Sequence, residues 1–177
     1  MLLIEAMKGK KHLVRKMEDL RKKIQLHCAD LDCMQPTYGS AEEQTKKISE
    51  WLQMHHDLAL ELTTLNKNIQ KTNLATNVTI KIDDKPITRS ILEWVIRRQG
   101  IIDLEVSAYN VLSDRGYSDK SILSYGSVDR EKVKNARVRF YFNAADRDKQ
   151  LEILKSEKES IDNSLEVVNA TTTLIEN

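Results

Sequence analysis

The fold is decided by residues 62–88, which read LTTLNKNIQKTNLATNVTIKIDDKPIT. The first part has helical spacing, because its apolar residues recur every three or four positions. After an Asn- and Thr-rich cluster, Val78, Ile80 and Ile82 alternate with polar residues, as in a strand with one buried side. Residues 83–86, Asp-Asp-Lys-Pro, are typical of a turn. The stretch therefore predicts the end of a long helix, then a strand, and then a turn before the next helix.

The composition indicates a mainly helical protein. Of its 177 residues, 31% are charged and only 5% are aromatic, with five Gly and two Pro. This balance suits long amphipathic helices and is unlike that of a β-sandwich or a glycine-rich α/β enzyme. The length fits one domain, so we expect a single domain over residues 1–177. The net charge of +1 makes a membrane or polymeric nucleic acid an improbable partner.

Two long helices are expected before the strand, over residues 3–33 and 41–74. Ser40 and Glu43 form a capping-box pattern at the start of the second helix. The expected seams are Ala6, Lys10, Leu13, Met17, Leu20, Ile24, His27 and Leu31, and Ile48, Leu52, His55, Leu58, Leu62, Leu65 and Ile69. Heptad-like seams joined by a short linker predict an antiparallel helical hairpin, residues 1–76.

Two further helices are expected, over residues 89–113 and 144–170. Thr88 and Asn143 are their expected N-caps, because these side chains accept hydrogen bonds from free helical amides. The expected inward positions are Ile91, Val95, Arg98, Ile102, Val106, Tyr109 and Leu112, and Leu151, Leu154, Lys158, Ile161, Leu165 and Val168. The chain thus predicts an antiparallel bundle of four long helices plus a small two-stranded β element.

The second strand is expected at residues 137–142, RVRFYF, paired with residues 77–82. Two isolated strands are marginally stable in water, so this ribbon would lie on the bundle or on another subunit. Val138, Phe140 and Phe142 would then face the bundle, while the residues between them would face water.

Residues 125–142 combine cations with aromatic side chains. Five cations against two acids (five minus two) give +3, and four of the nine aromatic residues lie here. Guanidinium groups bind phosphate and aromatic rings stack on bases, so this segment is typical of a site for a small anionic ligand such as a nucleotide. The candidate ligand-binding residues are Arg98, Tyr125, Arg130, Lys134, Arg137, Arg139 and Tyr141. The alternative is the packed ribbon described above, without a ligand.

Catalytic and metal-binding signatures are absent from the sequence. It has no glycine-rich phosphate loop, no nucleophile elbow and no His-Glu-x-x-His motif. Residues 27–33 hold five potential metal ligands, but Cys28 and Cys33 would lie about 140° apart on a helix. We therefore expect a packed helix end, with no catalytic residues, no metal and no cofactor.

Several features predict a cytoplasmic protein. The apolar start is broken at Glu5 and lacks a signal-peptide core. No window approaches the roughly 18 apolar residues of a membrane span. Two cysteines do not form a disulfide framework.

Several motifs resemble the septicolysin-like family of helical bacterial proteins. They are the early Ala6…Leu13…Leu20-Arg21 helix, residues 65–76, the β element before Ile87-Thr88…Ile91-Leu92, Arg97-Arg98, and residues 169–176. The resemblance covers nearly the whole chain and implies a helical bundle assembled into a homo-oligomer, with no agreed reaction. Gln99 stands where relatives are expected to carry an Asp, and residues 119–135 are longer than usual for the family.

Three classes of function follow from these observations. The first is a non-catalytic oligomer that binds or sequesters a small anionic ligand, such as a nucleotide signal, near residues 125–142. The second is a structural or protein-interaction scaffold without a small ligand. The third is an enzyme whose site the sequence does not reveal.

Overall fold

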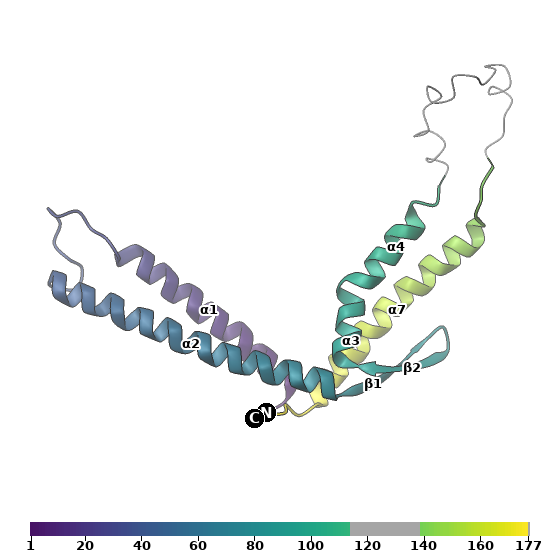
Figure 1. Cartoon of the computed structure of the whole chain (residues 1–177), viewed down its shortest axis with the longest axis horizontal. Coiled ribbons are helices and arrows are strands. Elements are labelled where there is room, and N and C mark those ends of the chain that lie inside the picture. Colours follow the sequence, from purple (N-terminus) through teal and green to yellow (C-terminus); the bar gives the residue numbers. More distant parts are fainter. Residues whose placement is uncertain (114–138, 177) are drawn as a thin grey trace, which may run out of the picture. The chain divides into compact units, whose positions relative to one another are not determined.

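The computed structural model describes residues 1–113 and 139–176, which are mainly helical with one small antiparallel sheet (Figure 1). The elements are α1 (Leu3–His27), α2 (Ala41–Ala75), β1 (Asn77–Ile82), β2 (Lys85–Ser90), α3 (Ile91–Ile96), the π-helical turn η1 (Arg97–Ile101), α4 (Ile102–Asn110) and α7 (Ala144–Thr171). Where one domain was expected, contacts divide the chain into two compact units. The first is Met1–Thr76 with Glu166–Asn177, and the second is Asn77–Leu165. In the described part of the chain, no helix has the length and apolar composition needed to span a membrane.

In the first unit, α1 and α2 form the expected antiparallel hairpin. The capping box of α2 is confirmed, because the Glu43 N–H donates to Ser40 Oγ at 3.2 Å and the Ser40 N–H donates to the Glu43 carboxylate at 3.2 Å. The first helix is shorter than expected. It ends at His27, and Leu31 is 67% exposed in a turn where the Met34 N–H donates to the Leu31 carbonyl.

Most of the predicted α1 seam is confirmed, whereas the start of the α2 seam needs a correction. Leu13 and Leu20 of α1 are buried, but in α2 the buried residue is Trp51, while Leu52 is 54% exposed. From Ile48, a step of three and then four residues reaches His55 through Trp51, and a step of four and then three reaches it through Leu52. The large Trp51 ring is the one that packs, 5.7 Å from the ring of His27 and 5.5 Å from that of Tyr38. The buried Gln44 amide completes this end of the hairpin by donating to the His27 carbonyl at 2.7 Å.

The C-terminal segment closes the other end of the hairpin. We call residues 172–176 the C-terminal clasp. Its backbone pairs with the chain start, since the Leu3 N–H donates to the Thr172 carbonyl at 2.9 Å and the Leu174 N–H to the Met1 carbonyl at 2.8 Å. The Ile175 N–H donates to the hydroxyl of the fully buried Thr72 at 2.9 Å. Two of the motifs that carry the family resemblance, residues 65–76 and 169–176, are therefore in direct contact.

In the second unit, β1 has the predicted bounds and the predicted alternation, with Ile80 buried. The predicted partner strand is wrong. β1 pairs with β2 through a two-residue turn, in which Asp83 and Asp84 have φ values of 49° and 60°. Two successive positive φ values match the type I′ turn favoured in tight hairpins. Of the predicted strand 137–142, residues 139–142 are not a strand, and residues 137 and 138 lie outside the described residues. The local hairpin prevails because closing a two-residue loop costs far less chain entropy than closing one of more than fifty residues.

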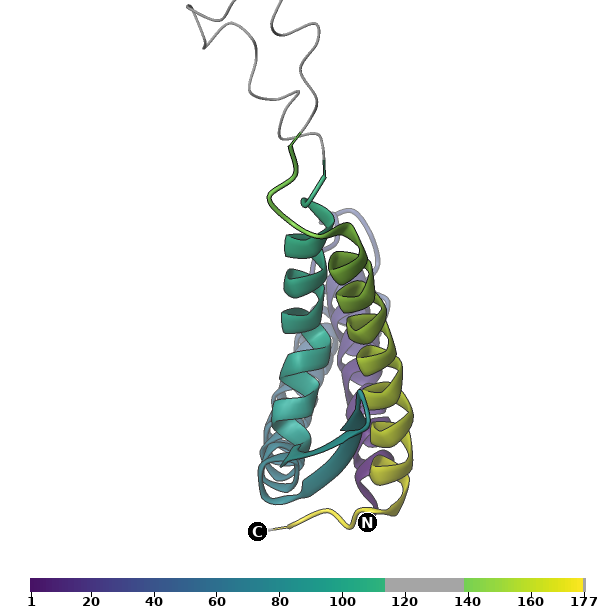
Figure 2. The same ribbon diagram turned by 90° about the vertical axis from the view of Figure 1, so that its right-hand side faces the viewer.

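The next helix begins two residues later than expected. Thr88 lies in β2, where its hydroxyl pairs with that of Thr79 at 2.7 Å, and Ser90 is the N-cap. α3, η1 and α4 then form a nearly continuous helix that lies beside α7 in both views (Figures 1 and 2). The predicted N-cap of α7 is confirmed by the hydrogen bond from the Ala145 N–H to Asn143 Oδ1, at 2.9 Å.

Candidate functional site

Four of the predicted ligand-binding residues, Tyr125, Arg130, Lys134 and Arg137, lie outside the described residues. Of the other three, Arg139 and Tyr141 lie in the segment that enters α7. Arg98 lies on η1, where it forms an ion pair with Asp162. Within the described residues, no hydrogen bond or ion pair joins Arg98 to the other two. Arg139 and Tyr141 are neighbours only through their two-residue separation in the chain.

The segment before α7 exposes aromatic side chains. We call Arg139, Phe140, Tyr141, Phe142 and Arg147 the aromatic–basic tip. Tyr141 is 90% exposed and Phe140 is 54% exposed. The rings of Phe140 and Phe142 meet edge to face, with centroids 5.4 Å apart. This arrangement differs from the packed-ribbon alternative, in which Phe140 would face a helical core.

Arg147 fixes the tip to the neighbouring helix end. Its guanidinium lies 5.7 Å from the centroid of the Phe142 ring and donates to the Leu112 carbonyl at 2.8 Å. It also pairs with Asp148 at 2.8 Å, so its charge is compensated. Arg139 is exposed and has no ion-pair partner among the described residues.

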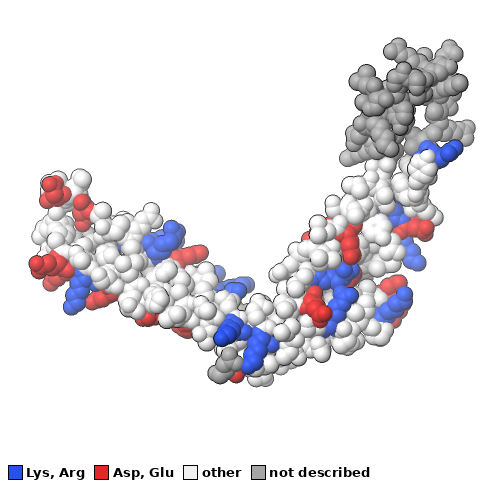
Figure 3. All heavy atoms as spheres, in the orientation of Figure 1, with Lys and Arg blue, Asp and Glu red and all other residues white. Residues whose placement is uncertain are grey.

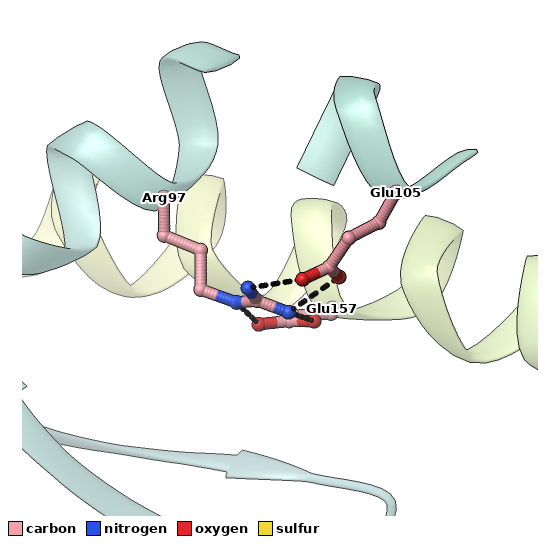
Figure 4. Close-up of polar contacts among 3 residues, drawn as sticks. All are labelled: Arg97, Glu105 and Glu157. Atoms are coloured by element: carbon pink, nitrogen blue, oxygen red, sulfur yellow. Dashed lines mark hydrogen bonds and ion pairs between the residues drawn. The ribbon is translucent and has the colours of Figure 1, made fainter. Parts of the chain in front are cut away.

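A second polar cluster lies between η1, α4 and α7 (Figure 4). The Arg97 guanidinium donates to both oxygens of the Glu157 carboxylate, at 2.7 Å to Oε2, and to both oxygens of Glu105 at 3.1 and 3.2 Å. The Glu157 side chain is only 5% exposed, whereas that of Glu105 is 42% exposed. Around the cluster, Lys158 pairs with Asp103 at 2.6 Å.

The Arg97 cluster joins η1, α4 and α7. Hydrogen bonds to Glu157, and then to Glu105, hold the pKa of Arg97 above its ordinary range. All four oxygens of the two carboxylates accept a hydrogen bond from the same permanently charged guanidinium. We find no nucleophile in hydrogen-bonding contact with the cluster among the described residues.

The predicted seams place both charged partners one residue too far along the chain. For Glu157 the reason is that steps of three and four residues from Leu154 reach Ile161 through either Glu157 or Lys158. For Arg97 the reason is an irregular turn. Arg97 takes the inward place expected for Arg98, and Glu157 takes that expected for Lys158. In η1 the Ile102 N–H donates to the Arg97 carbonyl, five residues back, which inserts one extra residue into the turn. The extra residue allows both Arg97 and the buried Ile102 to face α7. No sequence signal marks this π turn.

The predicted absence of a metal site at residues 27–33 remains a prediction. Both cysteines are exposed and free. Within residues 1–113 and 139–176, no three His, Cys, Asp or Glu side chains are placed to hold a metal ion together. His27 packs between the Trp51 and Tyr38 rings, as expected for a helix end.

Comparisons with family models, with curated proteins and with solved structures find no match for this chain. The resemblance to the septicolysin-like family therefore stays a prediction from the sequence.

Proposed function

We propose that this chain is a non-catalytic, homo-oligomeric helical protein that binds a small anionic aromatic ligand, such as a nucleotide signal, at the aromatic–basic tip. The observation that carries the proposal is the exposure of Tyr141 and Phe140 beside Arg139. Exposed aromatic side chains that pack in no core are typical of interaction sites. Aromatic rings stack on bases and guanidinium groups bind phosphate, so this pair of groups suits a nucleotide.

The position of the tip adds support. Its residues 139–142 lie just before α7, whose N-terminus carries the partial positive charge of the helix dipole. Asp146 and Asp148 oppose this charge, so the sequence-predicted cations Arg130, Lys134 and Arg137 would have to contribute to anion binding. Binding a ligand without a reaction needs only such contacts, and no nucleophile contacts the Arg97 cluster among the described residues.

The test is the melting temperature of the full chain with nucleotides. A ligand present at 100 times its dissociation constant stabilises the fold by about 2.7 kcal/mol, which corresponds to a rise of several degrees. We expect this rise with nucleoside triphosphates and its loss in Arg139→Ala and Tyr141→Ala. Arg21→Ala, an exposed arginine of α1, is the matched control and should keep it.

Inorganic triphosphate, which has no base, distinguishes stacking on the Tyr141 ring from binding of phosphate by the guanidinium groups. If stacking on Tyr141 contributes, triphosphate without a base should give a smaller rise than the nucleotide at equal concentration. No rise with any nucleotide at millimolar concentration would count against the proposal.

A structural scaffold is the second candidate, and the large apolar side chains exposed on the helices favour it. Examples are Leu52 and Leu60 on α2, at 54% and 56% exposed, and Leu104 on α4, at 68%. A scaffold would self-associate and show no response to nucleotides. The four-helix bundle expected from the sequence is then proposed to form between copies of the chain.

A further inference from the structure

A groove lies at the end of the α1–α2 hairpin that the C-terminal clasp closes. We call it the clasp groove. Its volume is about 560 Å³, which is the size of a site for a small molecule. α1 contributes Gly9 and Leu13 to its lining, α2 contributes Leu65 and Asn68, and the clasp contributes Leu174. All of its lining residues belong to the first unit.

Hydrogen bonds fix the walls of the clasp groove. The Thr72 hydroxyl donates to the backbone carbonyl of Asn68 at 2.8 Å and accepts from the Ile175 N–H at 2.9 Å. One buried side chain thus joins the clasp to α2, one turn away from Asn68. Leu13 and Leu174 are each 5% exposed and form an apolar floor. The groove therefore has a fixed backbone frame and an apolar base.

Asn68 is the unusual residue of this groove. It is only 8% exposed, and its amide oxygen Oδ1 is buried without a hydrogen-bond donor among the described residues. A buried acceptor without a partner lowers the stability of a fold, and Asn is not a strong helix former that would offset the loss. The terminal torsion of an Asn side chain is broad, so a small rotation would turn Oδ1 toward a donor in the groove. The groove thus offers one hydrogen-bond acceptor beside an apolar floor.

Gly9 is a second unfavourable residue at the same place. Glycine inside a helix is less stable than alanine. Among the described glycines, only Gly39 has a positive φ, so the backbone does not require glycine at position 9. A Cβ at Gly9 would lie 3.6 Å from Leu65 Cδ2, which is an ordinary contact, so close packing does not require glycine either. Its missing side chain leaves the groove open beside Leu65, and two locally unfavourable residues in one groove are typical of a functional site.

The charges around the clasp groove do not favour an anion. Its ionisable side chains are His12, Lys16, Glu61 and Glu176, which carry both signs. On the face of the hairpin seen in Figure 3, Lys and Arg atoms are likewise interspersed with Asp and Glu atoms. The groove therefore differs from the aromatic–basic tip, and its apolar floor suits an uncharged ligand.

We propose that the clasp groove binds a small, uncharged and largely apolar molecule that donates an N–H or O–H hydrogen bond to Asn68 Oδ1. The apolar body of the ligand would lie on Leu13, Leu65 and Leu174. Its donor would satisfy the buried acceptor, which no described side chain does. The site is separate from the aromatic–basic tip and takes a different class of ligand, so it does not depend on the proposed function.

An NMR titration of the full chain with indole tests this site, and 1-methylindole is the matched probe without an N–H donor. We expect saturable shifts of the Asn68 side-chain amide and of the Gly9 and Leu174 backbone N–H signals. Indole should bind roughly five- to tenfold more tightly than 1-methylindole, which is the usual effect of one hydrogen bond. The same shifts in Tyr141→Ala would exclude stacking of indole on the tip as their cause.

Two variants separate binding from stability. Asn68→Leu keeps the shape of the side chain but removes the acceptor, so indole should lose its advantage while the melting temperature of the free chain stays equal or rises. Asn66→Leu, on the same helix but outside the groove, is the matched control and should keep the advantage. Gly9→Ala should weaken both probes about fivefold or more, because the methyl group narrows the groove, and should not lower the melting temperature.

The outcomes are distinct from those of the nucleotide experiment. Equal affinity for the two probes in the wild type, or an indole advantage that survives Asn68→Leu, would overturn the role of Asn68. No shift at Asn68 with either probe at millimolar concentration would overturn the groove as a site. An Asn68 signal that responds to protein concentration and not to indole would show instead that a second copy covers the groove. A chain that binds indole but no nucleotide would support the groove and count only against the tip.

Discussion

At the scale of single residues, Arg97 is the most informative side chain of the second unit. Its own side chain is 19% exposed, and it neutralises Glu157, which is 5% exposed. Replacing it by Met keeps much of its apolar volume but leaves a buried carboxylate without a partner. We expect Arg97→Met to lower the free energy of unfolding by about 3 kcal/mol, as measured by urea denaturation.

The neighbouring Arg98 supplies the control for this prediction. Its side chain and that of Asp162 are 45% and 41% exposed, so water screens their ion pair. Arg98→Met should cost less than about 1 kcal/mol. If both variants lost the same free energy of unfolding, the loss in Arg97→Met would not come from the burial of Glu157. The sequence pattern placed Arg98, and not Arg97, at the inward position, because a regular helical period cannot reveal the extra residue in the π turn.

At the scale of elements, the β hairpin shows what the sequence could and could not predict. Alternating Val78, Ile80 and Ile82 correctly predicted β1 and its buried side. The next residues are typical of a turn, and Thr88 is typical of an N-cap, so the pattern predicts no second strand there. In a two-stranded sheet both strands are edges, so Pro86 is tolerated opposite Lys81. Pattern alone did not distinguish this local partner from the more distant residues 137–142.

The cap that joins the hairpin to α3 should depend on pH. Hydrogen bonds from the Ser90 hydroxyl and backbone N–H, at 2.7 and 2.8 Å, hold the pKa of Glu93 below its ordinary value of 4.5. A carboxylate with a lowered folded pKa stabilises the fold above its unfolded pKa, and this stabilisation is lost as the pH falls through the folded value.

We therefore expect the wild type to be more stable than Glu93→Gln at neutral pH, and the difference to shrink below pH 4.5. Thermal unfolding of both proteins across this range measures it. Glu18→Gln, which replaces an exposed carboxylate in the middle of α1, should show no such trend. A difference independent of pH would mean that the cap acts without the charge of Glu93.

At the scale of the whole molecule, the two compact units share helix α7, which begins in the second unit and ends in the first. The seams of the long helices were largely predictable, because burial follows a period of three and four residues. The pairing of α1 with α2 was also predictable, because a short linker joins them. Which other seams meet was not, since a heptad seam fits many partners. Two motifs of the sequence analysis, residues 65–76 and 169–176, did carry information about the fold, because these segments meet at Thr72.

That meeting point yields a prediction about the first unit as a whole. Thr72→Val keeps the shape of a fully buried side chain but removes the acceptor of the Ile175 N–H. We expect a loss of about 1 kcal/mol, together with faster amide exchange at the Leu3 and Leu174 N–H groups, because these bonds belong to the same clasp. Thr63→Val is the control, since its hydroxyl makes the same bond to the carbonyl four residues back but is exposed. Exchange in β1 should stay unchanged in both variants. If β1 also exchanged faster in Thr72→Val, the clasp would stabilise both units, and the division of the chain at Thr76 would not be an energetic one.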